Sequence, residues 1–467
     1  MKVFDITNYG ASGDGKKDNA VEIQKAIDEC SASGGGVVYF PGNNVFMSGP
    51  FDLKSNVNLM MESNSVLLAN PDESVYKKSA FKKNLGEGTI WIGGENAENV
   101  TISGTGTIDG NGIAFMGPEE KAAYVLKPFN VVDPRPHLLT AINIKNLLIR
   151  DVTFKNSAYW CLHIIGCDNV RIESATILNH LKIRNGDGID IDHSKNVRIA
   201  NCYIESGDDC ICFKTRREYE EYGPTENVIV SNCIMTSTSC SIKLGSENMD
   251  AIRNVIVSDC IIKSSNRGIG IQNRDEGIVE NIIFKNIFVE GRLFDDVWWG
   301  KAEPIYVTAY KRKTSADKDS NVRFAKGQTV GKVGEVRKIF FDNIKCESEN
   351  GVFIGGEENK ISEVKIENSS FKIEKKTKYE GGIYDLRPSD TVGLLKDEVA
   401  AFYFDTANDI TVSNCSVKWG KDNPAYFNKV LRAKDVCNLH VTKIQGQPAK
   451  PHSEKMEFIN CRNLNAE

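Results

Sequence analysis

The sequence has no apolar run long enough to cross a membrane and no basic stripe of the kind that binds nucleic acid. A net charge of -5 also argues against a nucleic-acid partner. No secretory leader precedes the folded-looking sequence that begins at Val3. The chain is therefore either cytoplasmic, which we favour, or begins after a processing site. With 40% hydrophobic and 26% charged residues, its composition is ordinary for a soluble globular protein.

Zinc-type C-x-x-C pairs are also missing, and thirteen cysteines, an odd number, cannot form a complete set of disulfides. Four cysteines follow an Asn or Asp in the same local phrase: Cys202, Cys233, Cys260 and Cys415. We expect these four to be small buried residues stacked at one recurring position. This use of cysteine favours a reducing compartment.

A repeat begins near residue 99 and sets the fold class. Each copy starts with Asn, continues with alternating apolar residues, turns on polar residues and ends in a second alternating strand. Copies begin at Asn146, Asn169, Asn196, Asn227, Asn254 and Asn281, and later ones lie near Lys338, Glu363, Asp409 and Asn438. One unit has too little apolar surface to be stable alone, so the units must stack. The prediction is an all-β, right-handed parallel β-helix that forms a single domain over residues 1–467.

The first 70 residues are expected to form an N-terminal cap and the first coils. A short helix is predicted to start near Asp18, to bury Val21, Ala26, Ile27 and Cys30 on one face, and to end at the glycines that follow residue 33. Strands are predicted at 37–40, 57–61 and 66–68. Further along, residues 295–335 interrupt the repeat, and we expect an inserted loop over the binding groove there.

Two acidic turns, one repeat apart, stand out as the candidate catalytic site. The first reads Asn185-Gly186-Asp187-Gly188 and the second Ser206-Gly207-Asp208-Asp209, and each leads into a short alternating strand. Superposing the two repeats places Asp187 over Asp209, with Asp208 beside them. Three carboxylates in one patch repel one another, so at least one should have a raised pKa, as acid/base glycoside hydrolysis needs. The alternatives are a solvated acidic turn or a calcium site.

The repeat and these turns resemble glycoside hydrolase family 28, the polygalacturonase family. The opening Phe4 to Ala11, and the segment from Asn156 through Trp160 to His163, also carry the resemblance. The family motif Asn-Thr-Asp is matched by Asn185-Gly186-Asp187, and Gly-Asp-Asp by Gly207-Asp208-Asp209. The resemblance implies an inverting hydrolase that needs no cofactor or metal and acts on an oligo- or polysaccharide.

The resemblance also implies the catalytic roles. Asp208 would be the general acid that protonates the leaving oxygen, while Asp187 and Asp209 would hold and deprotonate the attacking water. Inversion needs the acid and the base roughly 6.5–9.5 Å apart, to leave room for that water. We therefore expect Asp208 to point away from a convergent pair formed by Asp187 and Asp209.

Two family motifs are not matched. Gly-His-Gly falls on Ser239-Cys240-Ser241, and Arg-Ile-Lys falls on Gly270-Ile271-Gln272, so the family's cations that grip a galacturonate carboxylate are missing. Stacking the repeats places Arg267 over Cys240 and Lys243 over Gly270. We expect Arg267 and Lys243, with Arg274 and Lys214 as further candidates, to rebuild a cationic wall; the alternative is that these are ordinary exposed charges.

Other residues are candidates for sugar contacts. Tyr306 occupies about the position of a sugar-binding tyrosine of the family, and Trp298 or Trp299 could stack on a ring. His163 aligns over Asp190 and is expected to face solvent in the groove, ahead of His180 and His193. Arg135 could reach a carboxylate from the N-terminal side.

Three functions remain open from the sequence. The first is an α-glycosidase acting on a pectic glycan, with galacturonate before the cleaved bond, a sugar such as rhamnose after it, and possible exo action. The second is a polysaccharide lyase or uronate epimerase on the same scaffold, with calcium or a cation at the carboxylate. The third is a glycan-binding solenoid without activity. The sequence gives no oligomeric state.

Overall fold

The computed structural model describes residues 2–81, 88–121, 123–128, 135–313 and 331–467. These residues form two compact units. Unit 1 contains residues 1–211 and 221–233, and unit 2 contains residues 212–220 and 234–467. The single-domain organisation stays a prediction. No helix within the described ranges has the length and apolarity to pass through a bilayer.

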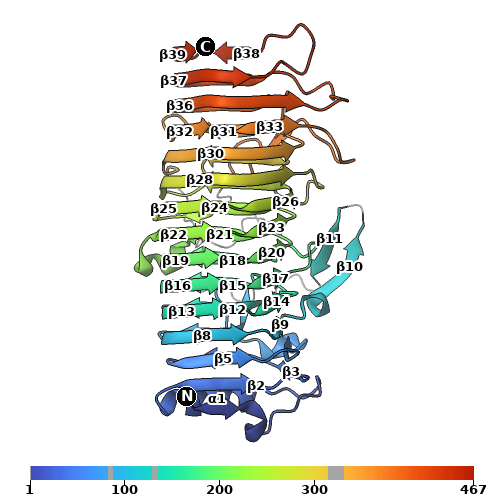
Figure 1. The fold of residues 1–467 in the computed structure, drawn as a ribbon, viewed down its shortest axis with the longest axis vertical. Coiled ribbons are helices and arrows are strands. Elements are labelled where there is room, and N and C mark those ends of the chain that lie inside the picture. The colour runs from blue at the N-terminus through green and yellow to red at the C-terminus, as the bar shows by residue number, and fades with distance from the viewer. Residues whose placement is uncertain (1, 82–87, 122, 129–134, 314–330) are drawn as a thin grey trace. The chain divides into compact units, whose positions relative to one another are not determined.

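The sheet of unit 1 is arranged in three columns of parallel strands, and in the complete coils each column contributes one strand (Figure 1). The first column is β4 (Phe51–Leu53), β7 (Thr89–Glu95), β12 (Pro136–Ile142), β15 (Leu162–Ile165) and β18 (Ile189–Asp192). The second is β1 (Val3–Asp5), β2 (Gly36–Phe40), β5 (Val57–Met61), β8 (Glu98–Gly104), β13 (Lys145–Arg150), β16 (Asp168–Glu173), β19 (Lys195–Ala200) and β22 (Thr225–Ser231). The third is β3 (Val45–Ser48), β6 (Val66–Ala69), β9 (Thr107–Asp109), β14 (Thr153–Lys155), β17 (Thr176–Leu178) and β20 (Tyr203–Ser206).

Unit 2 has the same construction, with longer strands that pass from one column to the next. Its strands are the part of β21 (Ile211–Thr215) from residue 212, β23 (Ile234–Ser237), β24 (Cys240–Asn248), β25 (Ala251–Ser258), β26 (Ile261–Ser265), β27 (Arg267–Asn273), β28 (Ile278–Gly291), β29 (Glu303–Ala309), β30 (Val336–Ser348), β31 (Val352–Gly356), β32 (Ile361–Glu367), β33 (Ser370–Ile373), β36 (Phe402–Trp419), β37 (Leu431–Gln445), β38 (Met456–Ile459) and β39 (Arg462–Ala466). Apart from one antiparallel hairpin in each unit, described below, the strands pair in parallel, so the predicted β-helix is confirmed.

The core of each unit lies between the columns and is built from apolar residues in register. In unit 1, Phe51, Ile92, Leu139, Leu162 and Ile189 follow one another on successive coils, all buried. The alternating pattern of each short strand is what sends one apolar face inward. Because successive coils keep this register, equivalent turns of neighbouring coils lie next to each other.

The asparagines that open each repeat have a structural reason. All ten residues that start the predicted copies have positive φ, between 53° and 61°: Asn146, Asn169, Asn196, Asn227, Asn254, Asn281, Lys338, Glu363, Asp409 and Asn438. Asn enters this left-handed region more readily than other residues with a side chain. The side chains also form ladders: Asn169 Nδ2 donates to Asn146 Oδ1 (2.8 Å), and Asn146 Nδ2 to Asn99 Oδ1 (2.9 Å).

The cysteine prediction is confirmed. Cys202, Cys233, Cys260 and Cys415 are buried, and each Sγ lies 3.2–3.4 Å from the carbonyl oxygen two residues earlier. Each follows an Asn or Asp at positive φ. The thirteen cysteines, all within the described residues, are free thiols.

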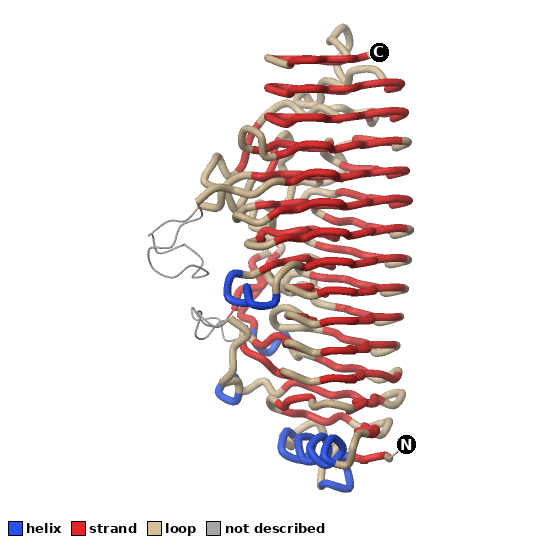
Figure 2. The backbone as a smooth tube through the Cα atoms, turned by 90° about the vertical axis from the view of Figure 1, so that its left-hand side faces the viewer, coloured by secondary structure: helices blue, strands red, loops and turns tan. Residues whose placement is uncertain are grey.

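The N-terminal cap is α1 (Ala20–Ala32), which packs against the first coils of unit 1 (Figure 2). Its N-cap is Asn19, one residue after the predicted start. Asp18 accepts hydrogen bonds from the backbone N–H groups of Ala20 and Gly49, both at 2.9 Å. The predicted burial of Val21 is wrong, because Val21 is 62% exposed and Ile23 takes the inward position instead.

Three excursions depart from the predicted plan. The hairpin of β10 (Met116–Glu120) and β11 (Val125–Pro128) in unit 1, and the hairpin of β34 (Ile383–Asp385) and β35 (Leu394–Lys396) in unit 2, were not predicted. The inserted loop predicted at 295–335 is wrong for residues 303–309, since β29 is a regular strand there, in register with β27. Residues 314–330 of that loop lie outside the described residues.

Apart from α1, the helices within the described residues are short and of the 3-10 type. They are η1 (Ile6–Tyr9), η2 (Glu73–Val75), η3 (Gly112–Phe115) and η4 (Arg217–Tyr222).

Candidate active site

The two acidic turns meet in unit 1. Gly188 N donates to Asp209 O (2.8 Å) and Ile189 N to Cys210 O (2.9 Å), so Asp187 lies beside Asp209 on the next coil. One carboxylate oxygen from each of Asp187, Asp208 and Asp209 lies within 4.8 Å of the other two. Asp187 and Asp209 are buried and Asp208 is partly exposed. The predicted convergence across coils is therefore confirmed.

Close backbone approaches fix the position of these turns. A Cβ on Gly207 would lie 2.2 Å from Ile183 O, and one on Gly188 would lie 2.5 Å from Cys210 O. Real Cβ atoms do not come so near, so a side chain at either position would force the backbone to shift. Asn179 Nδ2 adds hydrogen bonds to Gly186 O (3.2 Å) and Asp187 O (3.0 Å).

The limit of 4.8 Å joins one oxygen of each of the three residues. The roughly 6.5–9.5 Å expected for an inverting enzyme is instead the separation between the carboxyl groups of the acid and the base. The expected acid–base separation therefore stays a prediction. The stereochemical course therefore has to be measured and does not follow from this spacing.

The same three oxygens could also bind a metal ion, because carboxylates are the ligands that Ca²⁺ prefers. Calcium takes about six to eight oxygen ligands, and the cluster offers one oxygen from each of three residues. The calcium alternative is thus chemically possible, and removal of divalent ions tests it.

Arg135 lies beneath the first acidic turn. Its Nη1 donates to Arg184 O (2.6 Å) and to Ala158 O (3.1 Å), and its Nη2 to Asn185 Oδ1 (3.4 Å). Arg135 is buried, with its guanidinium 4.8 Å from the centre of the Tyr159 ring. These contacts hold the turn that carries Asp187, and a direct contact between Arg135 and substrate stays a prediction.

The prediction that His163 faces solvent is wrong. Its predicted register over Asp190 is confirmed, but the side chain is fully buried, with Nε2 3.2 Å from Asp192 Oδ2. The ring packs at 4.8 Å against Trp160. Alternation along β15 puts His163 on the face opposite Leu162, which belongs to the core. His163 is buried there because the rings of Phe81 and His137 also pack against it. Of the other two candidates, His193 is also buried, and His180 is half-buried, which lowers its pKa.

Arg267 in unit 2 forms an ion pair with Glu303. Its register opposite Cys240 is as predicted, but it is 1% exposed, with Nε and Nη2 each 3.2 Å from a carboxylate oxygen of Glu303. Burial alone would lower the pKa of Arg267, whereas the charge of Glu303 raises it above its ordinary value. The guanidinium also lies 3.6 Å from the centre of the Tyr306 ring. The expectation of a cation lining the groove stays a prediction for Arg267, and its contacts favour a structural role.

Tyr306 is likewise buried, and its hydroxyl donates to Asp385 O at 2.6 Å. Arg274 lies beside it, with Nη2 3.3 Å from that hydroxyl, and burial lowers the pKa of Arg274. Lys214 is buried too and pairs with Glu247 at 3.7 Å. These three predicted substrate-binding groups all have protein partners.

Lys243 and Trp299 lie together in unit 2. Lys243 is paired in register with Gly270, as predicted, and its Nζ lies 5.3 Å from the centre of the Trp299 ring. Trp299 is half-buried, whereas the neighbouring Trp298 is buried. A cation over a partly exposed aromatic ring is an arrangement suited to an acidic sugar.

Asp385 and Arg387 form an ion pair close to Trp299 that was not predicted. Arg387 Nε donates to Asp385 Oδ1 and Nη2 to Asp385 Oδ2, both at 2.8 Å. In the sequence this ion pair shows only as an acidic and a basic residue two positions apart, at 385 and 387. Their partners lie more than 80 positions earlier in the chain, so no local pattern could have identified them.

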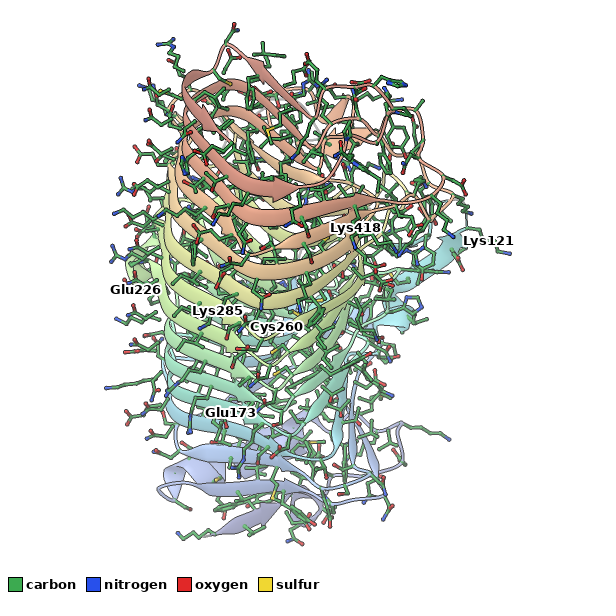
Figure 3. All side chains as sticks on the ribbon, turned by 45° about the horizontal axis from the view of Figure 1, so that its top comes forward. Lys121, Glu173, Glu226, Cys260, Lys285 and Lys418 are labelled. Atoms are coloured by element: carbon green, nitrogen blue, oxygen red, sulfur yellow. The ribbon has the colours of Figure 1, made fainter. Side chains whose placement is uncertain are left out.

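A groove of about 480 Å³ lies elsewhere in unit 2, on the outer face of strands β26, β28, β30, β33 and β36. It is lined by Lys263, Phe288, Lys345 and Lys418 among others, and Lys418 lies on the outer surface in Figure 3. None of its lining residues is one of the predicted site residues. The chemistry of the acidic cluster, and not this cavity, identifies the candidate site.

Comparisons with known proteins show the family of the chain. The model of Glycosyl hydrolases family 28 matches residues 30–380. A probable polygalacturonase of Vitis vinifera is 32% identical over 270 residues, which cover 53% of this chain and 52% of that protein. An exopolygalacturonase of Cochliobolus carbonum is 27% identical over 238 residues, which cover 50% of this chain and 49% of that protein.

Among solved structures, the family 28 exopolygalacturonase of Yersinia enterocolitica aligns with a TM-score of 0.67 at 17% identity, over 100% of this chain and 79% of that one. This likeness shows the fold, the predicted right-handed parallel β-helix. The sequence alignments span about half the length of the curated relatives.

Proposed function

Because the chain belongs to family 28 of the glycosyl hydrolases, we propose that it hydrolyses α-glycosidic bonds in a uronate-containing pectic glycan. The observation that carries this proposal is the meeting of Asp187, Asp208 and Asp209 within 4.8 Å, at the positions that match the family's acidic motifs. The names of the relatives, polygalacturonase and exopolygalacturonase, support galacturonide as the sugar before the cleaved bond.

The exposures of the three carboxylates support a division of roles. Asp208, the partly exposed one, donates the proton to the leaving glycosidic oxygen. Asp187 and Asp209, the buried pair, hold the water and remove its proton as it attacks.

On the substrate side, Lys243 and Trp299 are the proposed contacts, since they combine a cation with a partly exposed ring. Arg267, Tyr306, His163 and Arg135 remain predictions as direct ligands, and their described contacts are with protein groups. Gly270 and Gln272 replace two family cations, so the sugar after the cleaved bond is proposed to be uncharged, such as rhamnose.

Exo action is part of the proposal, supported by the Cochliobolus relative. An exo-acting enzyme removes units from one chain end, so single small products appear while the polymer stays long. An endo-acting enzyme would shorten the polymer before small products accumulate. Viscosity measured together with reducing ends separates the two modes.

The test is a panel of defined pectic oligosaccharides, with the released anomer followed by NMR. We expect cleavage of a galacturonate–rhamnose bond with inversion, and loss of turnover in Asp208→Asn. Faster cleavage of pure polygalacturonan would contradict the uncharged sugar after the bond. A retained anomer would contradict the assigned water-activating pair, and full turnover in Asp208→Asn would contradict the assigned acid.

The lyase or epimerase alternative makes a different product. A lyase leaves an unsaturated uronate, which absorbs in the ultraviolet, and its rate would fall with a chelator if calcium neutralises the carboxylate. Hydrolysis gives no such absorbance. Binding of pectic glycans without any turnover would instead favour a solenoid that only binds.

A further inference from the structure

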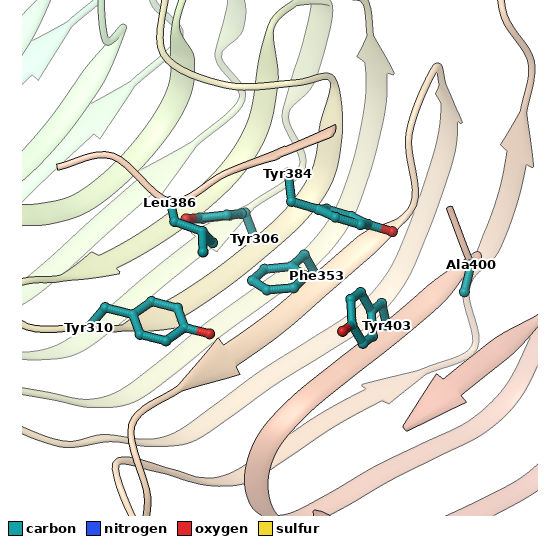
Figure 4. Packing of buried hydrophobic residues seen from close by; sticks show 7 residues of the cluster. All are labelled: Tyr306, Tyr310, Phe353, Tyr384, Leu386, Ala400 and Tyr403. Carbon is teal, nitrogen blue, oxygen red and sulfur yellow. The ribbon is translucent and has the colours of Figure 1, made fainter. Parts of the chain in front are cut away.

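The excursion between β33 and β36 in unit 2, residues 374–401, packs against a buried apolar cluster. Tyr384 and Leu386, on either side of Asp385, pack into a buried cluster with Tyr306, Phe353 and Tyr403 (Figure 4). The ring centres of Phe353 and Tyr384 are 4.8 Å apart. Asp385 is therefore held on a rigid support, with its own side chain fully buried.

Asp385 and Arg387 both hydrogen-bond to the backbone of the loop formed by residues 296–300. Asp385 Oδ2 accepts a hydrogen bond from Gly300 N at 2.8 Å. Arg387 Nη1 donates to Asp296 O at 2.7 Å and Nη2 to Trp298 O at 3.0 Å. The three contacts lie on both sides of Trp299 in the sequence.

The charges of this pair are stable at neutral pH. Burial works to raise the pKa of Asp385, but the hydrogen bonds and charge of Arg387, helped by Arg267, lower it below its ordinary value. The same pair raises the pKa of Arg387 against the effect of burial. Hydrogen bonds between ionised groups and backbone are stronger than neutral ones, so this clamp resists opening of the loop.

We propose that Asp385 and Arg387 are positioning residues that hold the Trp299 ring beneath the Lys243 ammonium. Trp299 and Lys243 in turn recognise the ring and the carboxylate of one uronate. The inference rests on the proposed function, which supplies the uronate. Trp299 offers a flat face for the sugar ring, and Lys243 offers the charge for its carboxylate. The excursion thus belongs to substrate recognition.

The clamp predicts a specific kinetic effect. Without it the loop must be ordered when substrate binds, at a cost of about 0.5–1.5 kcal/mol for each side chain immobilised, which corresponds to an increase in KM of up to about tenfold. The carboxylates that carry out the chemistry are unchanged, so kcat should stay within about threefold. Arg387→Ala is the test variant.

Two other variants separate positioning from general stability. Arg387→Lys keeps the charge beside Asp385 but cannot reproduce the forked contacts to the loop, so it should not restore KM. Arg337→Ala removes a comparable, partly exposed arginine of unit 2, which pairs with Glu280 at 3.0 Å and with Glu335 at 3.1 Å. Because Arg337 makes no described contact with the excursion or the loop, the KM of this variant should match that of the parent protein.

A readout that needs no turnover is the quenching of tryptophan fluorescence by acrylamide. Arg387→Ala should make one tryptophan more accessible, and the difference should vanish in a Trp299→Phe background. Affinity for trigalacturonate, measured in Asp208→Asn protein, should fall about tenfold with Arg387→Ala and by no more in the double variant with Trp299→Phe.

The outcomes separate the two proposals. If Asp208→Asn protein binds no uronate, the proposed function fails, while the quenching experiment still tests the clamp. If Arg387→Ala leaves quenching and affinity unchanged although Trp299→Phe weakens binding, the clamp is refuted and the function stands. Rescue of KM by Arg387→Lys, or an equal rise in Arg337→Ala, would also overturn the positioning role.

Discussion

Replacing Gly207 by alanine tests whether backbone packing beneath the acidic turns controls catalysis. A Cβ at residue 207 would meet Ile183 O at 2.2 Å and His180 O at 2.7 Å. Ordinary contacts begin at 3.4 Å, so the segment 180–183 and the Gly207 turn must separate by about 1.2 Å. That segment leads directly into Asp187, so the displacement reaches the catalytic cluster.

The expected magnitude follows from this displacement. A misplacement of about 1 Å can lower the rate by a factor on the order of 10². Overpacking of this kind costs roughly 1–3 kcal/mol in stability, so the variant should still fold. We therefore expect kcat for a galacturonide oligosaccharide to fall about 100-fold, with a melting temperature only a few degrees lower.

Two matched glycines make the prediction graded. A Cβ at Gly186 would lie 3.0 Å from Ile183 O, a contact that a small shift relieves, and one at Gly331 meets nothing within 4 Å. Activity should therefore increase in the order Gly207→Ala, Gly186→Ala, Gly331→Ala, the last being unchanged. Initial rates from released reducing ends and thermal unfolding by circular dichroism provide the measurements. Parent-level kcat in Gly207→Ala would refute the link between turn packing and catalysis.

The remaining predictions concern charge. Asp208→Asn should lower kcat by about 10²–10⁴ with unchanged thermal unfolding, measured as initial rates. Glu303→Gln should destabilise unit 2 by about 3–5 kcal/mol in urea unfolding, since it leaves the buried Arg267 guanidinium beside a neutral amide. Glu280→Gln, at the partly exposed Arg337 pair, should cost about 1 kcal/mol or less. The pKa of Asp385 is lower in the folded protein than its ordinary 3.8, so ionisation of Asp385 stabilises the fold above pH 3.8. This contribution disappears as the pH falls through the lower folded pKa. Asp385→Asn should therefore lose less stability than the parent protein between neutral and acid pH. A chelator should leave the rate unchanged if the acidic cluster works without calcium.

The fold could be predicted because the repeat carries its own physical explanation. Short alternating strands require a buried partner face, and the Asn at each repeat start marks a left-handed turn, as the positive φ at Asn146 and Asn169 shows. Lys338 and Glu363 were identified at equivalent positions despite their different side chains, because the surrounding apolar pattern was intact. The hairpins could not be predicted in this way, since they depart from the repeat and are stabilised by distant contacts.

The candidate site could be predicted only where register determines it. The meeting of Asp187 with Asp208 and Asp209 follows from stacking alone, and so do the pairings of Lys243 with Gly270 and Arg267 with Cys240. Register gives the neighbours of a residue but not the direction of a long side chain. Arg267 was expected in the groove, and the structure turns it toward Glu303, a partner 36 positions later.

The substitutions in the unmatched Arg-Ile-Lys motif and the unpredicted hairpin of unit 2 fit together physically. A Cβ on Gly270 would lie 2.9 Å from Arg267 Cδ and 2.9 Å from Cys240 Sγ, so a larger residue at 270 is incompatible with the course of Arg267 toward Glu303. Gln272, at the second missing cation, donates from Nε2 to Arg387 O at 3.0 Å and so ties the strand to the hairpin. Arg267 in turn donates to Asp385 O at 3.2 Å.

The space that two cations would occupy is therefore filled by the Arg267 side chain and by the hairpin that it helps to hold. Restoring one cation alone, as in Gly270→Arg, would displace Arg267 and leave Glu303 buried without its partner, which is costly. A cation does lie beside a partly exposed ring elsewhere in unit 2, at Lys243 and Trp299. The two unmatched positions and the hairpin are thus linked by contacts in unit 2, since Gly270 leaves room for Arg267, and Arg267 and Gln272 both donate to backbone oxygens at the hairpin.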